Sequence, residues 1–251
     1  MSTLYLGADA SEIAKYVLFS GDPWRVEILK KYLDEPKQVA FLREFNTYTG
    51  SYKGVRVTVT STGIGAPSAA IAMEEMYEAG MKVAVRMGTV MALADDMLGK
   101  FIIPIAAMRR EGTSLSYVEA SYPAVADISL LNCMNETVLQ MGAEYRNGIN
   151  CTMDGFYSKM HDSKFSRESD RNMTETFEEL KKLKVLGIDM ESSCMMTIGR
   201  LMGVKTCVVT MTTVLENLKE VLKGQERKDA EDLLCRVALE GICRYDNKKQ
   251  A

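Results

Sequence analysis

The sequence predicts an α/β domain of three layers, with helices on both faces of a central β-sheet. Short apolar runs rich in β-branched residues alternate with helix-length segments along the chain. The run Val83–Val85 is apolar without alternation, as expected of a strand buried on both faces of a parallel or mixed sheet. No Pro/Gly/Ser-rich linker, low-complexity tract or repeat interrupts the pattern, so residues 1–251 are expected to form a single domain.

The first half of the chain contains two turns that favour ligand binding. Strands are expected at residues 16–20, 38–41, 46–52 and 55–61, and helices at residues 23–31 and 67–79. The first strand runs into Gly21-Asp22-Pro23-Trp24-Arg25, where glycine permits a tight turn and proline suits the first turn of a helix. The free amides of this helix start, with Arg25 one turn in, suit an anion; a purely structural turn is the alternative.

The middle of the chain places a cation and a hydroxyl at a strand end. Arg86, Gly88 and Thr89 follow the strand expected at Val83–Val85. The carboxyl edge of a sheet is where open α/β proteins bind their ligands, so these residues are candidates for an anion site. A solvent-facing arginine at a strand end is the alternative interpretation.

The second half repeats the alternation. Strands are expected at residues 101–107, 148–153, 185–188 and 205–214, and helices at residues 128–141 and 173–184, after residue 189 and at the end of the chain. The charged segment 158–172 has weak periodicity and is predicted to be a mobile loop. Glu191 opens a helix directly after a strand, so it either caps that helix or faces a ligand.

Composition excludes several classes of protein. The chain is 47% hydrophobic with a formal net charge of −3, which gives no basic surface for nucleic acid or anionic lipid. No apolar run is long enough to cross a bilayer, and residues 1–6 are too short and polar for a secretory signal. Six cysteines without a CxxC pair indicate reduced thiols in a cytoplasmic protein. A single histidine argues against a catalytic zinc site and against a Ser-His-Asp hydrolase.

Five motifs together resemble the uridine/purine nucleoside phosphorylase family. The motifs, whose order and spacing fit along nearly the whole chain, are Gly21-Asp22-Pro23-Trp24-Arg25, Arg43-Glu44-Phe45, Ser61-Thr62-Gly63-Ile64-Gly65, Arg86-Met87-Gly88-Thr89 and Asp189-Met190-Glu191-Ser192. Residues 122–127 are also similar to the uridine phosphorylase pattern. The resemblance implies a three-layer α/β/α sandwich of phosphorylase/hydrolase-like fold, whose mixed central sheet closes partly into a barrel. It also implies a homodimer or a trimer of dimers.

The resemblance further implies where phosphate and ribose bind. It assigns phosphate to Gly21, Arg25, Arg86 and Thr89 of one subunit and to Arg43 of its neighbour. It assigns ribose to Tyr5, Met190 and Glu191, and it makes Arg86 and Glu191 the catalytic residues. Guanidinium groups bind phosphate oxygens bidentately, and three arginines in separate motifs are hard to explain as surface charge. Glu44, Ile64 and Ser68 align with the monovalent-cation site of some uridine phosphorylases, which makes K⁺ a candidate ion.

The sequence departs from the family where the base binds. Uridine phosphorylases place a Gln and an Arg at the positions of Met160 and Asp162, and hexameric purine enzymes place an Asp at that of Val214. Phe156 is suited to stack on a base. The candidate polar residues for reading the base, each of which is equally explained as a loop or core residue, are His161, Asp162, Thr212, Thr213 and Glu216.

The sequence therefore predicts phosphorolysis of a nucleoside, with uridine favoured, to a free base and ribose 1-phosphate. Inorganic phosphate is the expected co-substrate, and no other cofactor is expected. A purine nucleoside phosphorylase is the first alternative. A nucleoside hydrolase is a further alternative, but such an enzyme has no use for three phosphate-directed arginines. A catalytically silent relative that binds nucleoside is the last alternative, and only the altered base-binding positions favour it.

Overall fold

A closed ring of five strands forms one half of the central sheet in the computed structural model, which describes residues 2–169 and 173–250. In ring order the strands are β5 (Val83–Ala92), β10 (Lys205–Leu215), β6 (Phe101–Arg110), β8 (Tyr145–Met153) and β9 (Val185–Asp189). The ring closes because β5 pairs in parallel with β10 and antiparallel with β9. The β6–β8 and β8–β9 pairs are parallel, whereas β10 and β6 are antiparallel. The predicted mixed, partly barrel-like sheet is confirmed.

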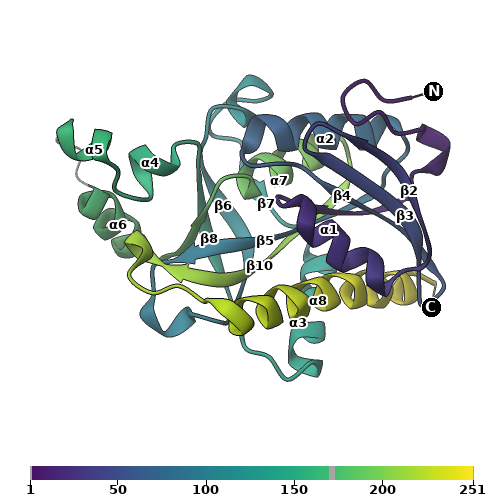
Figure 1. Cartoon of the computed structure of the whole chain (residues 1–251). Helices are drawn as coiled ribbons and strands as arrows, with labels where there is room; N and C mark the ends of the chain where they lie inside the picture. The colour runs from purple at the N-terminus through teal and green to yellow at the C-terminus, as the bar shows by residue number, and fades with distance from the viewer. Residues whose placement is uncertain (1, 170–172, 251) are drawn as a thin grey trace.

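The other half of the sheet extends from β5 as an open, twisted layer (Figure 1). Its strands, in spatial order, are β1 (Tyr16–Ser20), β4 (Val55–Ser61), β3 (Phe45–Tyr52) and β2 (Asp34–Leu42). A further short strand, β7 (Ala124–Val125), pairs with β6 of the ring. β1 is parallel to both β4 and β5 and is buried along its whole length. β2 lies at the edge and is mostly exposed, so the core is centred on β1 and β5.

Helices cover both faces of the sheet (Figure 1). One face carries α1 (Pro23–Leu29), α3 (Ile128–Gln140) and α8 (Gly224–Gln250), and the opposite face carries α2 (Ala66–Glu78) and α7 (Ser192–Leu201). Alternate residues of β1 enter separate apolar clusters: Leu18 packs with residues of α1, α3 and α8, and Phe19 packs with residues of α2 and α7. This alternation follows from the two-residue period of a strand and confirms the three layers.

Three short helices project beyond the barrel, at the left of Figure 1. They are α4 (Phe156–Lys159), α5 (Lys164–Glu168) and α6 (Met173–Lys182). The segment predicted as a mobile loop, residues 158–172, is thus helical at residues 158–159 and 164–168, and residues 170–172 lie outside the described part. Ser163 and Ser166 form a capping box that starts α5. Met160 is buried in an apolar cluster with Phe177 of α6, which anchors the segment.

Five single-turn helices complete the secondary structure of the described residues. They are η1 (Ala10–Glu12), η2 (Lys30–Tyr32), η3 (Asp95–Met97), η4 (Ser114–Ser116) and η5 (Glu216–Leu218). Within residues 2–169 and 173–250, no helix combines the length and the apolar character that a membrane span requires.

The structure corrects the predicted end of the strand that carries Arg86. β5 continues to Ala92, because it pairs with β10 along its whole length. Arg86 and Thr89 therefore lie within a strand rather than beyond one. β5 is long because it serves both halves of the sheet: residues 83–87 pair with β1, and Met91 and Ala92 pair with β9.

Candidate active site

A cavity of ≈ 860 Å³ opens among the turns after β1 and β4, the strands β5 and β9, and α4. All five sequence motifs contribute to its wall, the motif at residues 43–45 through Glu44 alone. The lining residues are Gly21, Asp22, Pro23, Arg25, Glu44, Gly63, Ile64, Arg86, Thr89, Val90, Met91, Phe156, Tyr157, Met160, Ile188, Asp189, Met190, Glu191 and Val214. The fold thus brings together motifs that are up to about 170 residues apart in the sequence.

The two glycine-containing turns at the cavity lie against each other. The Thr62 amide donates to the Ser20 carbonyl over 2.7 Å, which joins the end of β4 to the end of β1. A Cβ atom at Gly21 would lie 3.2 Å from the Gly63 carbonyl oxygen, so glycine permits this close approach. Gly63 itself has a φ of +69°. The turns therefore depend on glycine for both spacing and backbone conformation.

Two buried arginines lie at this end of the cavity. The parallel register of β1 and β5 sets Arg86 opposite Phe19, next to Ser20, and the Arg25 Nη1 atom lies 3.5 Å from the Ser20 hydroxyl. Arg25 is 6% exposed and Arg86 is 4% exposed. Arg25 Nε, Arg86 Nε and Arg86 Nη1 are buried and have no hydrogen-bond partner among the described residues. Unpartnered buried guanidinium N–H groups are costly, so this arrangement suits an anion that supplies the acceptors.

Glycine also shapes the surroundings of Arg86. A Cβ atom at Gly88 would lie 2.9 Å from Arg86 Nη2 and 3.0 Å from its Cζ. The guanidinium group therefore folds back over Gly88, two residues along the same strand. This contact explains why a glycine follows the arginine at that spacing.

Glu191 contacts Arg86 directly in the wall of the cavity. Its Oε2 atom accepts a hydrogen bond from Arg86 Nη2 and forms an ion pair with it, and its Oε1 atom accepts from the Gly65 amide over 2.6 Å. Glu191 occupies the N-cap position of α7, but its side chain makes no capping hydrogen bond. Asp189 accepts from the Ser192 amide and hydroxyl instead. The Glu191 carboxylate thus lines the cavity and does not cap the helix.

Burial governs the protonation of these charged groups. It raises the pKa of Glu191 above its ordinary value, and the nearby Arg86 opposes that rise. Burial also lowers the pKa of Arg25, whereas Glu231 and Asp22 act in the opposite direction. The Glu231 carboxylate, on α8, lies 3.5 Å from Arg25 Nη2. Each charged group has an opposite charge nearby, which keeps the site close to neutral.

The structure brings together part of the predicted phosphate and ribose sites. Gly21, Arg25, Arg86, Thr89, Met190 and Glu191 all line the cavity. Arg43 and Tyr5 do not line it. They are exposed and contact each other, with the Arg43 guanidinium carbon 5.4 Å from the centre of the Tyr5 ring. Both remain free to reach another subunit, as the resemblance implies.

The predicted base-binding residues divide in the same way. Phe156 and Met160 line the cavity, whereas Asp162 and Thr213 do not. Asp162 accepts a hydrogen bond from Asn217 over 3.3 Å. Thr213 is 1% exposed and lies at a register shift in β10.

The other candidate base readers also lie outside the lining. The His161 ring packs 6.0 Å from the Phe156 ring, Glu216 pairs with Lys181 and Lys219, and Thr212 is fully buried. The sequence did not single out Ile188 or Tyr157, which line the cavity. The positions of Met91 and Ile188 depend on pairing between β5 and β9, which no local pattern encodes.

The three residues aligned with a cation site lie near the mouth of the cavity. The Ser68 hydroxyl donates to Glu44 Oε1 over 2.9 Å and also to the Thr62 carbonyl. Ile64 is 79% exposed. Three oxygen atoms, from Ser68, Glu44 and Thr62, thus meet at an exposed edge of the cavity.

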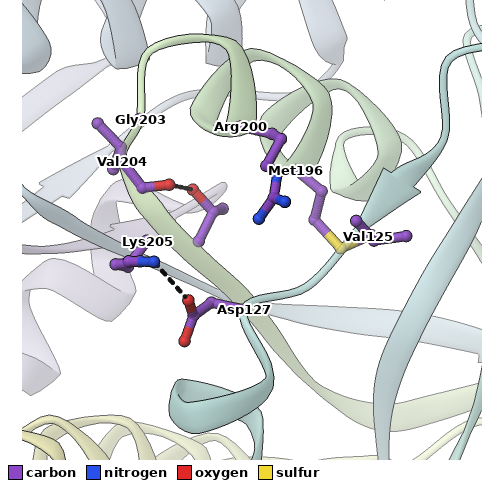
Figure 2. Close-up of a pocket in the computed structure, with 8 residues that line it drawn as sticks. Val125, Asp127, Met196, Arg200, Gly203, Val204 and Lys205 are labelled. Atoms are coloured by element: carbon purple, nitrogen blue, oxygen red, sulfur yellow. Dashed lines mark hydrogen bonds and ion pairs between the residues drawn. The ribbon is translucent and has the colours of Figure 1, made fainter.

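A second, smaller hollow lies apart from this cavity, where the C-terminal end of α7 meets the start of β10 (Figure 2). Lys205 pairs with Asp127 over 3.2 Å, and the Thr206 hydroxyl donates to the Val204 carbonyl over 3.3 Å. Arg200 points into the hollow (Figure 2). None of the predicted site residues lines it.

Comparison with known proteins identifies the family. The model of the phosphorylase superfamily matches residues 15–240. The chain belongs to the phosphorylase superfamily. This confirms the resemblance found in the five motifs, and the match includes every motif that lines the cavity of this superfamily member.

Curated relatives match over nearly their whole length. Uridine phosphorylase from Thermococcus kodakarensis is 33% identical over 247 residues, which cover 98% of this chain and 88% of the relative. Guanosine phosphorylase from Halorubrum lacusprofundi is 31% identical over 239 residues, which cover 95% and 92%. The crystal structure of uridine phosphorylase from Vibrio fischeri superposes with a TM-score of 0.85 at 29% identity and covers 96% of this chain and 97% of that one. This superfamily member is thus similar to phosphorylases named for different bases.

Proposed function

We propose that this protein catalyses the phosphorolysis of a nucleoside, releasing the free base and ribose 1-phosphate, with uridine a favoured substrate. The observation that carries the proposal is the pair of buried arginines whose remaining N–H groups have no acceptor among the described residues. Relatives named uridine phosphorylase support the reaction class. The relative named guanosine phosphorylase supports a purine nucleoside as the alternative substrate.

The arginines provide a site for inorganic phosphate. Arg25 contacts the Ser20 hydroxyl at the end of β1, Arg86 lies on the neighbouring β5 opposite Phe19, and Thr89 and the Gly21 turn line the same cavity. Phosphate accepting from Arg86 Nε and Nη1 would leave Nη2 on Glu191. The arginine would then hold the nucleophile and the ribose-binding carboxylate in one fixed arrangement.

Glu191 supplies the opposite charge where the sugar binds. In this proposal its carboxylate accepts from the ribose 2′ and 3′ hydroxyls, beside Met190. Hydrogen phosphate attacks the anomeric carbon as the bond from that carbon to the base breaks. The base takes the bonding electrons and, through the solvent, the proton that the hydrogen phosphate loses. Positive charge develops on the sugar in the transition state, so a fixed carboxylate beneath it lowers the barrier.

The remaining predicted residues extend the proposal to an oligomer. Large apolar side chains are exposed at Ile64 (79%), which lines the cavity, and at Leu4 (81%) and Phe41 (60%), which lie close in sequence to Tyr5 and Arg43. A homodimer, alone or within a trimer of dimers, would cover this surface and deliver Arg43 and Tyr5 to a neighbouring site. The same interface would complete a monovalent-cation site at Glu44, Ile64 and Ser68. We place the enzyme in the cytoplasm, because its six buried cysteines are all free thiols.

Phosphate dependence is the direct test of the reaction. A panel of nucleosides is incubated with and without inorganic phosphate, and the free base and ribose 1-phosphate are measured. We expect cleavage only with phosphate. Equal cleavage without phosphate would identify a hydrolase, and binding without cleavage would identify a catalytically silent relative.

A further inference from the structure

One end of the cavity is a continuous apolar wall built across three strands. Met91 of β5 lies in register with Ile188 of β9 on one side and with Val214 of β10 on the other. All three side chains line the cavity. Neighbouring strands lie about 4.8 Å apart, so the row of three spans about 10 Å, roughly the long dimension of a nucleobase.

A register shift in β10 decides which residue completes this row. Thr212 lies opposite Val90 and Val214 lies opposite Met91, so Thr213 is the extra residue between two adjacent pairs. Without the shift, Thr213 would stand opposite Met91. The bulge thus puts an isopropyl group where a hydroxyl would otherwise face the cavity.

Methionine and aromatic side chains cover the apolar wall. Met160, Phe156 and Met190 line the cavity and pack in the same apolar cluster as Met91 and Ile188. Met160 is 2% exposed, so this part of the cover is held inside the protein. Methionine side chains adapt to ligands of different shape, and an aromatic ring stacks on any base.

The acidic side chains of the cavity are engaged elsewhere. Asp22 caps α1, Asp189 accepts from Thr152 and from Ser192, and Glu191 is held by Arg86 and Gly65. Arg86 is five residues from Met91 along β5, a separation of about 16 Å. The Tyr157 ring is 62% exposed at the rim and packs edge-on against Phe156 with ring centres 5.0 Å apart. Among the described lining residues, no buried polar side chain belongs to the apolar row or its cover.

We propose that this site holds the base by stacking and apolar contact rather than by side-chain hydrogen bonds, and so accepts both pyrimidine and purine nucleosides with weak discrimination. The inference rests on the nucleoside phosphorolysis proposed above. A site with hydrogen-bonding groups rejects a substrate that lacks the matching groups by about 10⁴–10⁵-fold, because its own buried groups lose their partners. An apolar pocket leaves nothing unpaired and discriminates by about 10–200-fold. Relatives named for uridine and for guanosine match this chain at 33% and 31% identity, as a base-tolerant site permits.

The decisive experiment compares kcat/KM for uridine, 3-methyluridine and guanosine at saturating phosphate. The 3-methyl group removes the N–H donor of the uracil edge while keeping the ring. We expect all three nucleosides to be cleaved within about 200-fold of one another, the range of an apolar pocket. A larger spread would overturn the inference but leave phosphorolysis intact. No phosphate-dependent cleavage of any nucleoside would overturn the proposed function itself.

Two variants test the wall. Val214→Thr adds a hydrogen-bonding group to the wall and preserves the side-chain size. Met160→Gln adds a hydrogen-bonding group to the cover over the wall. We expect either variant to raise the preference for uridine over 3-methyluridine by about tenfold, the effect of one added hydrogen bond. Met160→Leu is the apolar control and should leave the ratio unchanged. An unchanged ratio in both polar variants, with folding verified by circular dichroism, would show that these residues do not face the base.

Discussion

Arg86 and Glu191, which are 105 residues apart in the sequence, form an ion pair in which each side chain is only 5% exposed. Arg86 comes from the middle of β5, and Glu191 stands between β9 and α7. Removing either partner leaves the other charge buried and uncompensated, which is costly unless a ligand replaces it. The ion pair thus connects β5 to the start of α7 and lies at the centre of the proposed site.

Arg86→Ala should reduce phosphorolysis by more than its loss of stability explains. We expect kcat/KM for phosphate to fall by about 10²–10³-fold, the usual effect of removing a preorganised donor. Steady-state kinetics with varied phosphate measures the change. Arg146→Ala is the matched control, because Arg146 pairs with Asp96 on the surface outside the cavity. Similar losses in the two variants would show that Arg86 does not bind phosphate.

The sequence predicted most of the fold and only part of the site, for identifiable reasons. Strands such as Tyr16–Ser20 were predictable because both faces are buried and the sequence is apolar throughout. The length of β5 was not, because its second half is fixed by pairing with β10 and β9. Glu75 of α2 is another example, because it is only 8% exposed and accepts from the amides of Tyr5 and Leu6, about 70 residues away in the sequence. Such long-range partners leave no local signal.

Site residues follow the same division. Arg25 and Arg86 stand in motifs that contain a glycine, and close contacts at Gly21 and Gly88 explain those glycines. Thr213 and Val214 are adjacent in sequence, and only the bulge in β10 decides that Val214 lines the cavity. Which of two neighbours faces a ligand is therefore a matter of register.

Subunit mixing tests the proposed shared site. Arg43 lies outside the cavity of its own chain, whereas Glu191 lies inside it. Arg43→Ala and Glu191→Ala homo-oligomers should both be nearly inactive. After they are mixed and allowed to exchange subunits, hybrid dimers should regain up to half of the activity per site, because one of their two sites carries neither substitution. Native mass spectrometry confirms that hybrids form, and hybrids without activity would contradict the shared site.

The cysteines should resist modification in the native protein. All six are buried, and burial raises the pKa of the Cys151, Cys207 and Cys235 thiols to about 12. Thiolates are the reactive form, so few are present at neutral pH. We expect iodoacetamide to label none of the six within minutes at pH 7.5 and all six in denaturant, as counted by mass spectrometry. Rapid labelling of a native cysteine would show local opening.

Glu191 should make stability depend on pH. Its pKa is raised by burial, so the folded protein binds more protons than the unfolded chain at pH values above the ordinary pKa of 4.5. The contribution of Glu191 to stability therefore falls as pH rises from 4.5 through the raised pKa, and Glu191→Gln removes this dependence. The difference in Tm between Glu191→Gln and the native protein should shift in favour of the variant over that interval. A difference that is constant with pH would contradict the raised pKa.

Glu191→Gln should also separate turnover from binding. The amide keeps the shape of the side chain and part of its hydrogen bonding but removes the negative charge beneath the sugar. Positive charge is greatest on the sugar in the transition state, so kcat should fall by about 10²-fold while the Kd for nucleoside changes little. Single-turnover kinetics and equilibrium binding measure the two quantities. Glu111→Gln is the matched control, because Glu111 is also buried but binds Ser114 and Ser193 outside the cavity.

The ribose hydroxyls give the same residue a second, independent test. If the Glu191 carboxylate accepts from the 2′ hydroxyl, a 2′-deoxynucleoside loses that charge-assisted hydrogen bond and should react more slowly with the native protein. In Glu191→Gln the bond is weaker from the start, so the ratio of kcat/KM between ribo- and deoxyribonucleoside should move toward one. This double comparison cancels general effects of the substitution on folding, because both substrates meet the same variant. If Glu191→Gln keeps full turnover and discriminates against the deoxynucleoside as the native protein does, Glu191 has no role in ribose binding. Its role would then be structural, through its contacts with Arg86 and the Gly65 amide.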